Sequence, residues 1–287
     1  MTLNCELCQL DRDDIDALIH LSTSVGWDYD AAELNTLLTV GCMFGHKTSA
    51  GDLVSSAAIV PYASTFAFLG MVIVHPEYRR RGLGEAVTAA ARDAMPAGSC
   101  VALVATPDGR GLYENMGFEV VTKVHKYVRS RIEAGSKADL RAHSAVALQA
   151  MRSEDLPRIA ELDALAFGVD RQAFLRQRWQ QSATSWIVTD DANVMGYALG
   201  IKGPVNWILG PLVARDDHYA SQLSAQIAAS TTDAVRIDVP SQHAEWATDE
   251  LMRMEFVKVA EPPIMTYLGR PLPIRHGLYA LAAQVFG

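Results

Sequence analysis

The 287-residue chain lacks any uncharged apolar run as long as the roughly 18 residues that a membrane-spanning helix needs. Its opening residues, MTLNCELCQLDRDD, have neither the basic start nor the apolar segment of a signal peptide. Basic side chains are not in excess, since 33 Asp and Glu outweigh 25 Lys and Arg. The resulting net charge of −8 repels nucleic-acid phosphates and mildly favours cationic partners such as amines. These absences predict a cytoplasmic protein that acts on neither membranes nor nucleic acids.

Cysteine is scarce, with four residues at positions 5, 8, 42 and 100. Cys5 and Cys8 form a C-x-x-C pattern that could be half of a metal site. A zinc site needs about four ligands, however, and no second close Cys or His pair follows. We therefore expect reduced thiols and no metal.

Two domains are expected from the length, at roughly 100–200 residues per domain. The segment LDRDDI, which begins at Leu10, resembles MRSEDL at Met151, and LGMVIV at Leu69 resembles LGPLVA at Leu209. A looser match joins MGFEV at Met116 to MEFVK at Met254. The nearly constant offset favours a duplicated unit over two unrelated α/β domains. Residues 131–147 are charged and small with little periodicity, so the predicted domains are 1–130 and 148–287 with a linker between them.

The first half alternates strand-like and helix-like segments. Asp11 or Asp13 can cap the first helix. Turn residues and apolar patterning predict strands at 3–10, 42–48, 53–61, 65–74, 100–105 and 118–129, and helices at 14–23, 30–38, 85–95 and 109–115.

A loop at residues 79–84, RRRGLG, follows an apolar strand and precedes a helix. Glycines allow a backbone turn whose N–H groups converge on one point, and the helix adds the positive end of its dipole. That combination, with neighbouring arginines, is suited to a pyrophosphate. The alternative is a surface turn that carries a solvated basic run.

Two segments, VIVHPEYRRRGLGEAV and LVATPDGRGLYENMGFEV, resemble the GNAT acetyltransferase superfamily. They match its coenzyme-binding strand-loop-helix and its LYE-x-x-GF signature, in the expected order. The resemblance covers residues 3–129, and the whole chain resembles tandem GNAT proteins whose second domain is divergent. It implies an α/β (α+β) fold of two GNAT-like domains. Each would be a mixed, mostly antiparallel sheet flanked by helices, with the fourth and fifth strands splayed apart.

The resemblance also implies acetyl-CoA as co-substrate. Backbone groups of the fourth strand would pair with its pantetheine arm, and N–H groups of residues 80–85 would hold its pyrophosphate. A main-chain N–H of the fourth strand would polarise the thioester carbonyl, and the acceptor amine would attack directly. The implied coenzyme-binding residues are Val72, Ile73, Val74, Arg79, Arg80, Arg81, Gly82, Leu83, Gly84 and Glu85.

Tyr113 matches the family's tyrosine that protonates the departing thiolate; alternatively, it is a helix tyrosine that packs next to Phe118. The family's acidic residue on the fifth strand is absent, because Val104 occupies that position. The nearest candidate bases are Asp28, Glu33 and His75, each of which also fits a cap, a solvated helix position or a loop. A water chain, or an amine that arrives neutral, would need no protein base.

The second half has no equivalent phosphate loop. Residues 215–224 contain no glycine but two aspartates, Asp216 and Asp217, and Leu251 stands roughly where Tyr113 would be. We therefore expect this domain not to bind coenzyme A, and to wall the acceptor pocket or only to stabilise the fold.

The function expected is transfer of an acetyl group to a primary amine of a small molecule. Two alternatives stay open: a non-catalytic acyl-CoA sensor, which the missing acidic residue at Val104 suggests, and a protein acetyltransferase.

Overall fold

The computed structural model describes residues 5–133, 147–191, 193–274 and 276–287, so most of the predicted linker lies outside the described residues. The chain forms two compact units. Unit 1 consists of Met1–Val121, Met265–Leu272 and Phe286, and unit 2 of Thr122–Ile264, Pro273–Val285 and Gly287. The expected boundaries at 130 and 148 therefore differ from the units, because each half of the sequence contributes a segment to the other unit.

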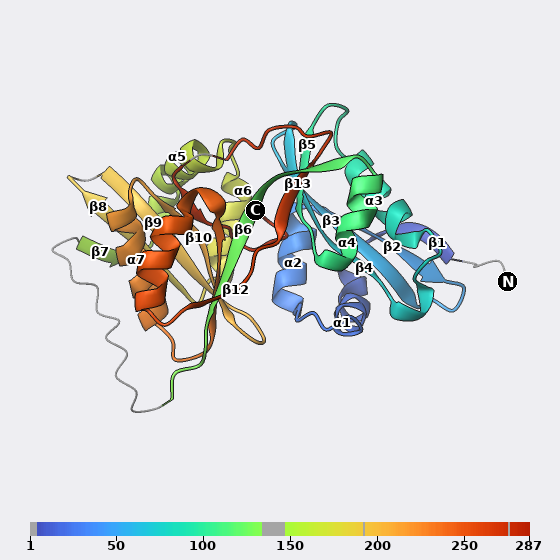
Figure 1. Ribbon diagram of the computed structural model, residues 1–287, viewed down its shortest axis with the longest axis horizontal. Helices are drawn as coiled ribbons and strands as arrows, with labels where there is room; N and C mark the ends of the chain where they lie inside the picture. The colour runs from blue at the N-terminus through green and yellow to red at the C-terminus, as the bar shows by residue number, and fades with distance from the viewer. Residues whose placement is uncertain (1–4, 134–146, 192, 275) are drawn as a thin grey trace. The chain divides into compact units, whose positions relative to one another are not determined.

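Unit 1 is a sheet in the order β1-β2-β3-β4-β5-β13, followed by the start of β6 (Figure 1). Neighbours among the first four strands are antiparallel, whereas β4 and β5 are parallel. The strands are β1 (Cys5–Leu10), β2 (Cys42–Thr48), β3 (Leu53–Tyr62), β4 (Phe66–Val74), β5 (Cys100–Val104), β13 (Pro263–Tyr267) and β6 (Phe118–Arg129).

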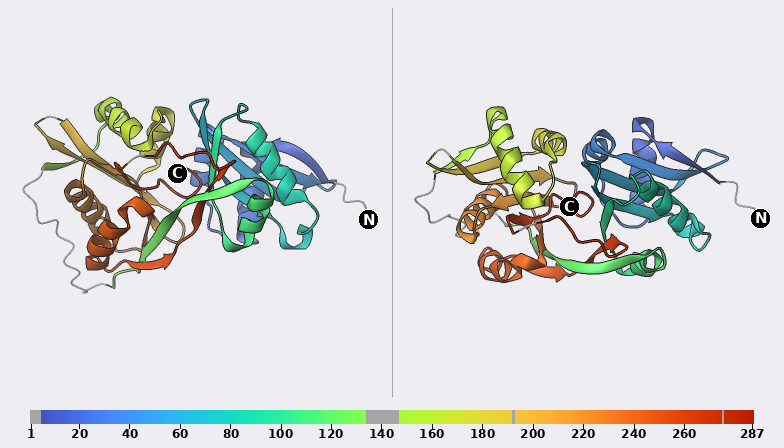
Figure 2. Two further views of the ribbon diagram at one scale, coloured as in Figure 1. Left: turned by 45° about the horizontal axis from the view of Figure 1, so that its top comes forward. Right: turned by 90° about the horizontal axis from the view of Figure 1, so that it is seen from above.

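The helices of unit 1 cover both faces of this sheet, with α1 and α2 on one side and α3 on the other (Figure 2). They are α1 (Ile15–Thr23), α2 (Ala31–Val40), α3 (Leu83–Asp93) and α4 (Pro107–Asn115). Asp30 caps α2 and Thr106 caps α4, each through a side-chain oxygen that accepts a backbone N–H. Asp11, one of the two residues expected at the first helix, caps the short turn at Arg12–Asp14.

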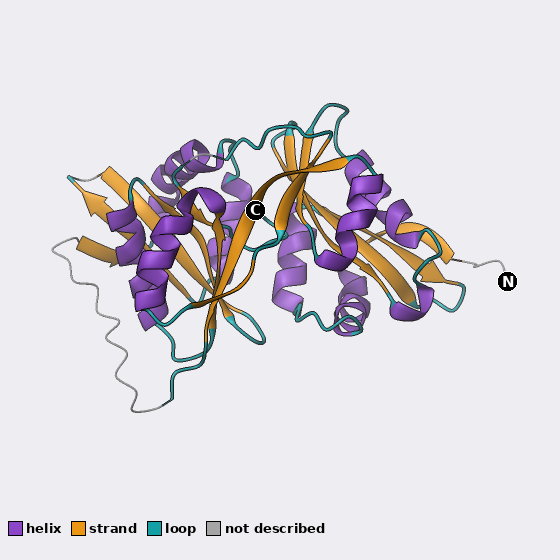
Figure 3. Cartoon of the chain, viewed as in Figure 1, coloured by secondary structure: helices purple, strands orange, loops and turns teal. Residues whose placement is uncertain are grey.

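Unit 2 repeats this plan, as the duplicated sequence segments predict (Figure 3). Its strand order is β6-β11-β10-β9-β8-β7, in which β10 and β11 form the parallel pair. Its strands are β7 (Ala147–Ala150), β8 (Thr184–Asp190), β9 (Asn193–Lys202), β10 (Trp207–Ala214), β11 (Val235–Pro240), β12 (Val257–Ala260) and β14 (Leu278–Ala280). Its helices are α5 (Leu156–Phe167), α6 (Gln172–Gln181), α7 (Asp217–Ala229) and the short α8 (Ala244–Trp246).

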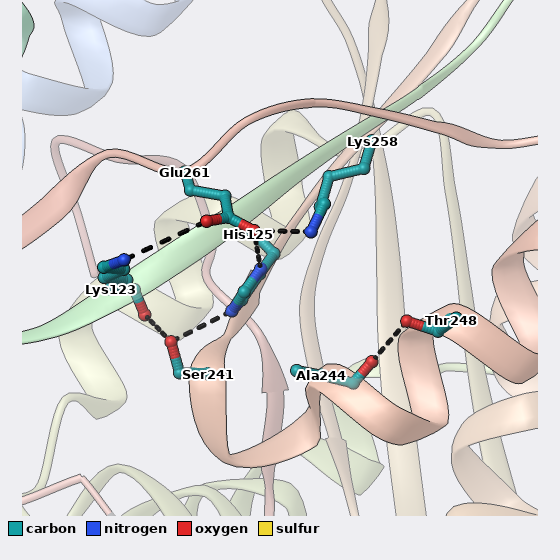
Figure 4. Close-up of polar contacts among 7 residues, drawn as sticks. All are labelled: Lys123, His125, Ser241, Ala244, Thr248, Lys258 and Glu261. Atoms are coloured by element: carbon teal, nitrogen blue, oxygen red, sulfur yellow. Dashed lines mark hydrogen bonds and ion pairs between the residues drawn. The ribbon is translucent and has the colours of Figure 1, made fainter.

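A polar network joins β6 to the chain around β11 and β12 in unit 2 (Figure 4). His125 Nε2 lies 3.0 Å from Ser241 Oγ, and His125 Nδ1 lies 3.2 Å from Glu261 Oε1. The Ser241 hydroxyl donates to the carbonyl oxygen of Lys123 at 2.9 Å. The ion pair with Lys258 lowers the pKa of Glu261. The Ser241 hydroxyl thus links the residue after β11 to the backbone of β6.

Strand β13 ties the second half of the sequence into unit 1. Met265 is fully buried and belongs to the core cluster that contains Tyr113 and Phe118. The Tyr267 ring lies 5.4 Å from the Phe118 ring, and the Leu268 N–H donates to the carbonyl oxygen of Gly117 at 2.8 Å. Unit 1 is therefore completed by residues that come from beyond position 260.

We predict that Met265→Ala destabilises unit 1 by about 2–5 kcal/mol, because it leaves a cavity in that core. Hydrogen exchange should show lost protection in β4 and β5. Met252, which is 61% exposed, provides the control, and Met252→Ala should change stability by less than about 0.5 kcal/mol. Protection lost in unit 2 while β5 stays protected would contradict the assignment of β13 to unit 1.

Candidate active site

A cavity of about 800 Å³ lies in unit 1, where β4, α3 and α4 meet. Four stretches of chain line it: the turn after α1, the end of β4, the loop into α3 and the first turns of α4. The lining residues are Val25, Trp27, Val72, Ile73, Val74, Tyr78, Arg79, Arg80, Gly82, Leu83, Gly84, Glu85, Thr106, Pro107, Asp108, Gly109, Leu112 and Tyr113. Tyr113 and all the predicted coenzyme-binding residues except Arg81 thus line a single cavity.

The cavity opens where β4 and β5 part. Their pairing runs from Phe66 with Cys100 to Phe68 with Ala102, and no further paired residues are described although β4 continues to Val74. The His75 N–H donates to the Val54 carbonyl of β3 at 2.9 Å. Because N–H directions alternate along a strand, the N–H groups of Val72 and Val74 face away from β3, towards the parted side. Backbone donors are therefore available along this edge.

The loop into α3 has the geometry of an anion-binding nest. Arg80 and Gly82 have left-handed backbones, with φ of 62° and 78°, and this alternation turns successive N–H groups to the same side. Gly82 is the N-cap of α3, and no side chain caps that helix. Its first N–H groups therefore stay available to an anion, supported by the helix dipole.

The three arginines of this loop differ in their contacts. All are exposed, and Arg79 and Arg80 line the cavity. Arg79 Nε donates to the Val74 carbonyl at 3.4 Å. Arg81 donates to the Glu77 carbonyl at 3.0 Å and lies 5.4 Å from the centre of the Tyr78 ring. Arg81 therefore packs on Tyr78 without lining the cavity itself, whereas Arg79 and Arg80 line it.

Helix α3 begins at Leu83, not at Glu85 as the sequence suggested, so Gly84 lies in its first turn. A Cβ at Gly84 would stand 3.3 Å from a Leu112 methyl and 3.4 Å from a Val74 methyl. Gly84 thus lets α3 approach β4 and α4 closely. Gly82 has open space around it, so its role is instead to adopt a left-handed backbone that other residues disfavour.

Tyr113 projects from α4 and is 7% exposed. Its ring meets Phe118 edge-on at 6.0 Å, so it packs next to Phe118 and also lines the cavity. Gly109 leaves room for the ring, since a Cβ there would lie 3.0 Å from Tyr113 Cε2. Burial raises the pKa of the Tyr113 phenol above its ordinary value. The phenol therefore keeps its proton across the physiological pH range.

Comparisons with known proteins agree with this geometry. Models described as acetyltransferase (GNAT) domains match residues 42–120 and, separately, 159–280. The uncharacterized N-acetyltransferase YitH of Bacillus subtilis (strain 168) is 33% identical over 98% of both chains. The chain belongs to the GNAT acetyltransferase family. It is a tandem GNAT protein, and membership of this family makes it an acyltransferase.

Solved structures show the same tandem GNAT fold. A proposed acetyltransferase of Pyrococcus horikoshii superposes with a TM-score of 0.81 at 18% identity, over 100% of this chain and 97% of the other. A tandem GNAT protein from the clavulanic acid biosynthesis pathway superposes with a TM-score of 0.64 at 16% identity, over 93% and 99%.

The candidate bases of this GNAT protein lie outside the cavity. Asp28 is exposed, Glu33 lies in the first turn of α2, and His75 accepts the Glu77 N–H at 3.4 Å as a cap. None of the three is among the residues that line the cavity, and neither is Val104. The acidic residues that do line it in the described chain are Glu85 and Asp108, both exposed. Asp108 follows Pro107 in the first turn of α4. Because it comes shortly after the fifth strand in the sequence, its place near the site could have been predicted.

In unit 2 the equivalent gap is filled. Strand β14 pairs with β10 at Leu212 and Val213, which the sequence repeat equates with Val72 and Ile73. On its other side, the Leu281 N–H donates to the Asp238 carbonyl of β11 at 2.9 Å. A Cβ at Gly210 would stand 2.0 Å from the Leu281 carbonyl oxygen, so Gly210 permits this insertion.

The start of α7, which corresponds to α3, is also occupied by protein groups. The Asp216 carboxylate caps the helix by accepting the Tyr219 N–H at 3.0 Å. The Asp217 carboxylate accepts the Tyr279 hydroxyl at 2.5 Å. An anion at this helix end would meet two carboxylates, so the second GNAT unit lacks the features that unit 1 offers a pyrophosphate.

Among the described residues, no group of three or more His, Cys, Asp and Glu side chains is arranged to hold a metal ion. No described helix combines the length and the apolar character needed to cross a membrane.

Proposed function

We propose that this chain is an acetyl-CoA-dependent N-acetyltransferase that transfers the acetyl group to a primary amine of a small molecule in the cytoplasm. One observation carries the proposal: unit 1 combines, around a single cavity, a parted β-strand pair, an anion-binding nest and a protonated tyrosine. Each feature fits a different part of acetyl-CoA.

The fit runs from the phosphates to the thioester. The nest and the open N-terminus of α3 offer N–H groups to a pyrophosphate, with Arg79 and Arg80 beside them. The N–H of Val74 can pair with an amide of a pantetheine arm as a further strand would, and the N–H of Val72 can donate to the thioester carbonyl oxygen. Acetyl-CoA would supply the activated thioester, and these groups would orient it.

The transfer needs two proton movements. The amine nitrogen donates its lone pair to the acetyl carbon, the carbonyl π electrons move to oxygen, and their return breaks the carbon–sulfur bond. Tyr113, kept neutral by burial, then gives its proton to the departing thiolate sulfur. The attacking amine gives its proton to water, and the Tyr113 phenolate regains a proton from water, so that the amide, the coenzyme A thiol and the starting enzyme result.

The net charge of −8 favours a cationic acceptor, in keeping with a small amine. Release of the coenzyme A thiol in the presence of an amine panel tests the activity itself. Tight acetyl-CoA binding without turnover on any small amine would instead favour the sensor, and turnover on peptide amines alone a protein acetyltransferase.

Gly82→Val should abolish measurable acetyl-CoA binding, because valine disfavours the left-handed backbone that forms the nest. Gly51 is the matched control, since it has φ of 92°, open space around it and no place in the cavity. Calorimetry should find normal affinity for Gly51→Val. A folded Gly82→Val variant with unchanged affinity would rule out the nest as the phosphate site.

Tyr113→Phe should keep acetyl-CoA affinity and lower kcat by about 10²–10⁴-fold, the usual value of general acid catalysis. Tyr267→Phe removes a hydroxyl from the same aromatic cluster without touching the cavity, so its kcat should stay near wild type. Steady-state kinetics under conditions where chemistry limits the rate decide the matter. Equal kcat values for the two variants would return Tyr113 to a packing role.

The chain should bind one acetyl-CoA, because β14 occupies the second gap and two carboxylates occupy the second helix start. Replacing Asp216 and Asp217 by Ala should leave coenzyme affinity nearly unchanged. Equilibrium titration measures the stoichiometry and the affinity. Two equivalent sites per chain would contradict the assignment of coenzyme binding to unit 1 alone. A chain truncated near Arg131 is no substitute for this test, since it would lack β13 of unit 1.

A further inference from the structure

Ser56 is fully buried on β3, at the bulge that interrupts its pairing with β4. Its hydroxyl donates to the carbonyl oxygen of Met71 at 2.9 Å. Met71 has a left-handed backbone with φ of 51°, which L side chains disfavour, and the β3–β4 register shifts between Ser56 and Ala58. The Ser56 hydroxyl thus holds one peptide group of the bulge in place.

The direction of that peptide follows from its planarity. In a trans peptide the C=O and the N–H point opposite ways, and the bond between Met71 and Val72 is trans. Since the Met71 carbonyl points to Ser56, the Val72 N–H points away from it. The hydrogen bond of His75 to Val54 gives the same direction independently. Val72 lines the cavity, so its N–H is directed at the space there.

We propose that Ser56 is a positioning residue for acetyl transfer. By fixing the Met71–Val72 peptide, it aims the Val72 N–H at the thioester carbonyl oxygen, which gains negative charge as the amine attacks. A donor held in advance stabilises that charge without reorganising during the reaction. This inference rests on the proposed function and adds the residue that sets its oxyanion donor.

Unit 2 supplies an internal comparison. In its β9–β10 register, Tyr197 pairs with Val213 as Ser56 pairs with Ile73, so Tyr197 stands in the place of Ser56. The Tyr197 hydroxyl donates to Asp163 at 2.5 Å instead of to the bulge. Pro211 replaces Met71 in the sequence repeat, and Leu212 pairs with Ala280. The serine, the left-handed residue and the open N–H edge thus occur together in the unit that has the cavity.

The test uses the full-length chain and acetyl-CoA labelled with ¹³C at the thioester carbonyl. In the wild-type complex the carbonyl resonance should move downfield from that of free acetyl-CoA, because a hydrogen bond polarises the bond. In Ser56→Ala much of that shift should disappear while the Kd changes by less than about 3-fold. Loss of a direct oxyanion donor lowers kcat by about 10²–10³-fold, so loss of its support should lower kcat by about 10- to 100-fold.

Ser55→Ala is the matched control. Ser55 is equally buried on the same strand, but its hydroxyl bonds His46 Nδ1 at 2.7 Å, away from the bulge. This variant should lose comparable stability and keep the full carbonyl shift. Ser56→Thr retains the hydroxyl, so it should show the wild-type carbonyl shift and kcat. If Ser56→Ala does not fold, a Ser56→Thr variant that lacks the shift would contradict the role of Ser56.

The outcomes separate the two proposals. A wild-type chain that binds no acetyl-CoA would contradict the proposed function. Binding with no carbonyl shift, or a shift that persists in a folded Ser56→Ala variant, would contradict the role of Ser56 alone.

Discussion

The parting of two parallel strands is the constraint on which the rest of the structure depends. Buried backbone N–H and C=O groups need partners, and a strand that diverges from its neighbour leaves a row of them unsatisfied. In unit 1, β4 leaves β5 after Phe68 and runs on to Val74 beside a cavity. The surrounding loop and helix start supply anion-binding groups at one end of this edge, and Tyr113 lines the same cavity. The sheet geometry therefore leaves backbone groups unpaired, and a ligand with amides and phosphates can supply their hydrogen-bond partners.

The two units provide hydrogen-bond partners for the parted strands in different ways. In unit 2 the chain's own β14 fills the gap, and Asp216 caps the helix that would otherwise receive an anion. At the helix start a carboxylate replaces a glycine-built nest. Gly210, which admits the Leu281 carbonyl, is not itself a substitution, because the repeat equates it with Gly70 of unit 1. The same fold is thus a binding site in one copy and a satisfied core in the other, which explains a tandem GNAT protein with unequal halves.

Local signals in the sequence predicted much of the site. The glycines and arginines of residues 79–84 indicated the nest, and the residues around Tyr113 indicated the helix that lines the cavity. Most strand and helix positions agree within two residues, because apolar patterning and caps such as Asp30 and Thr106 are local. The sequence repeat likewise predicted the second sheet.

Features that depend on contacts between distant residues could not be predicted from these local signals. The exchange of β13 into unit 1 depends on packing of Met265 and Tyr267 against residues about 150 positions away, which periodicity does not reveal. The left-handed Met71 carries no glycine to mark it, and its partner Ser56 reads as an ordinary strand residue. Trp27 lines the cavity only because the folded chain brings the turn after α1 there.

The most direct test of the account is a crystal structure of the full-length chain with coenzyme A. We expect one coenzyme per chain, with its pyrophosphate on the N–H groups of residues 80–85 and its pantetheine arm paired with β4 through the Val74 N–H. Strand β14 should remain in place between β10 and β11. Coenzyme bound in unit 2 with β14 displaced, or bound in unit 1 away from the parted strands, would contradict the central claim.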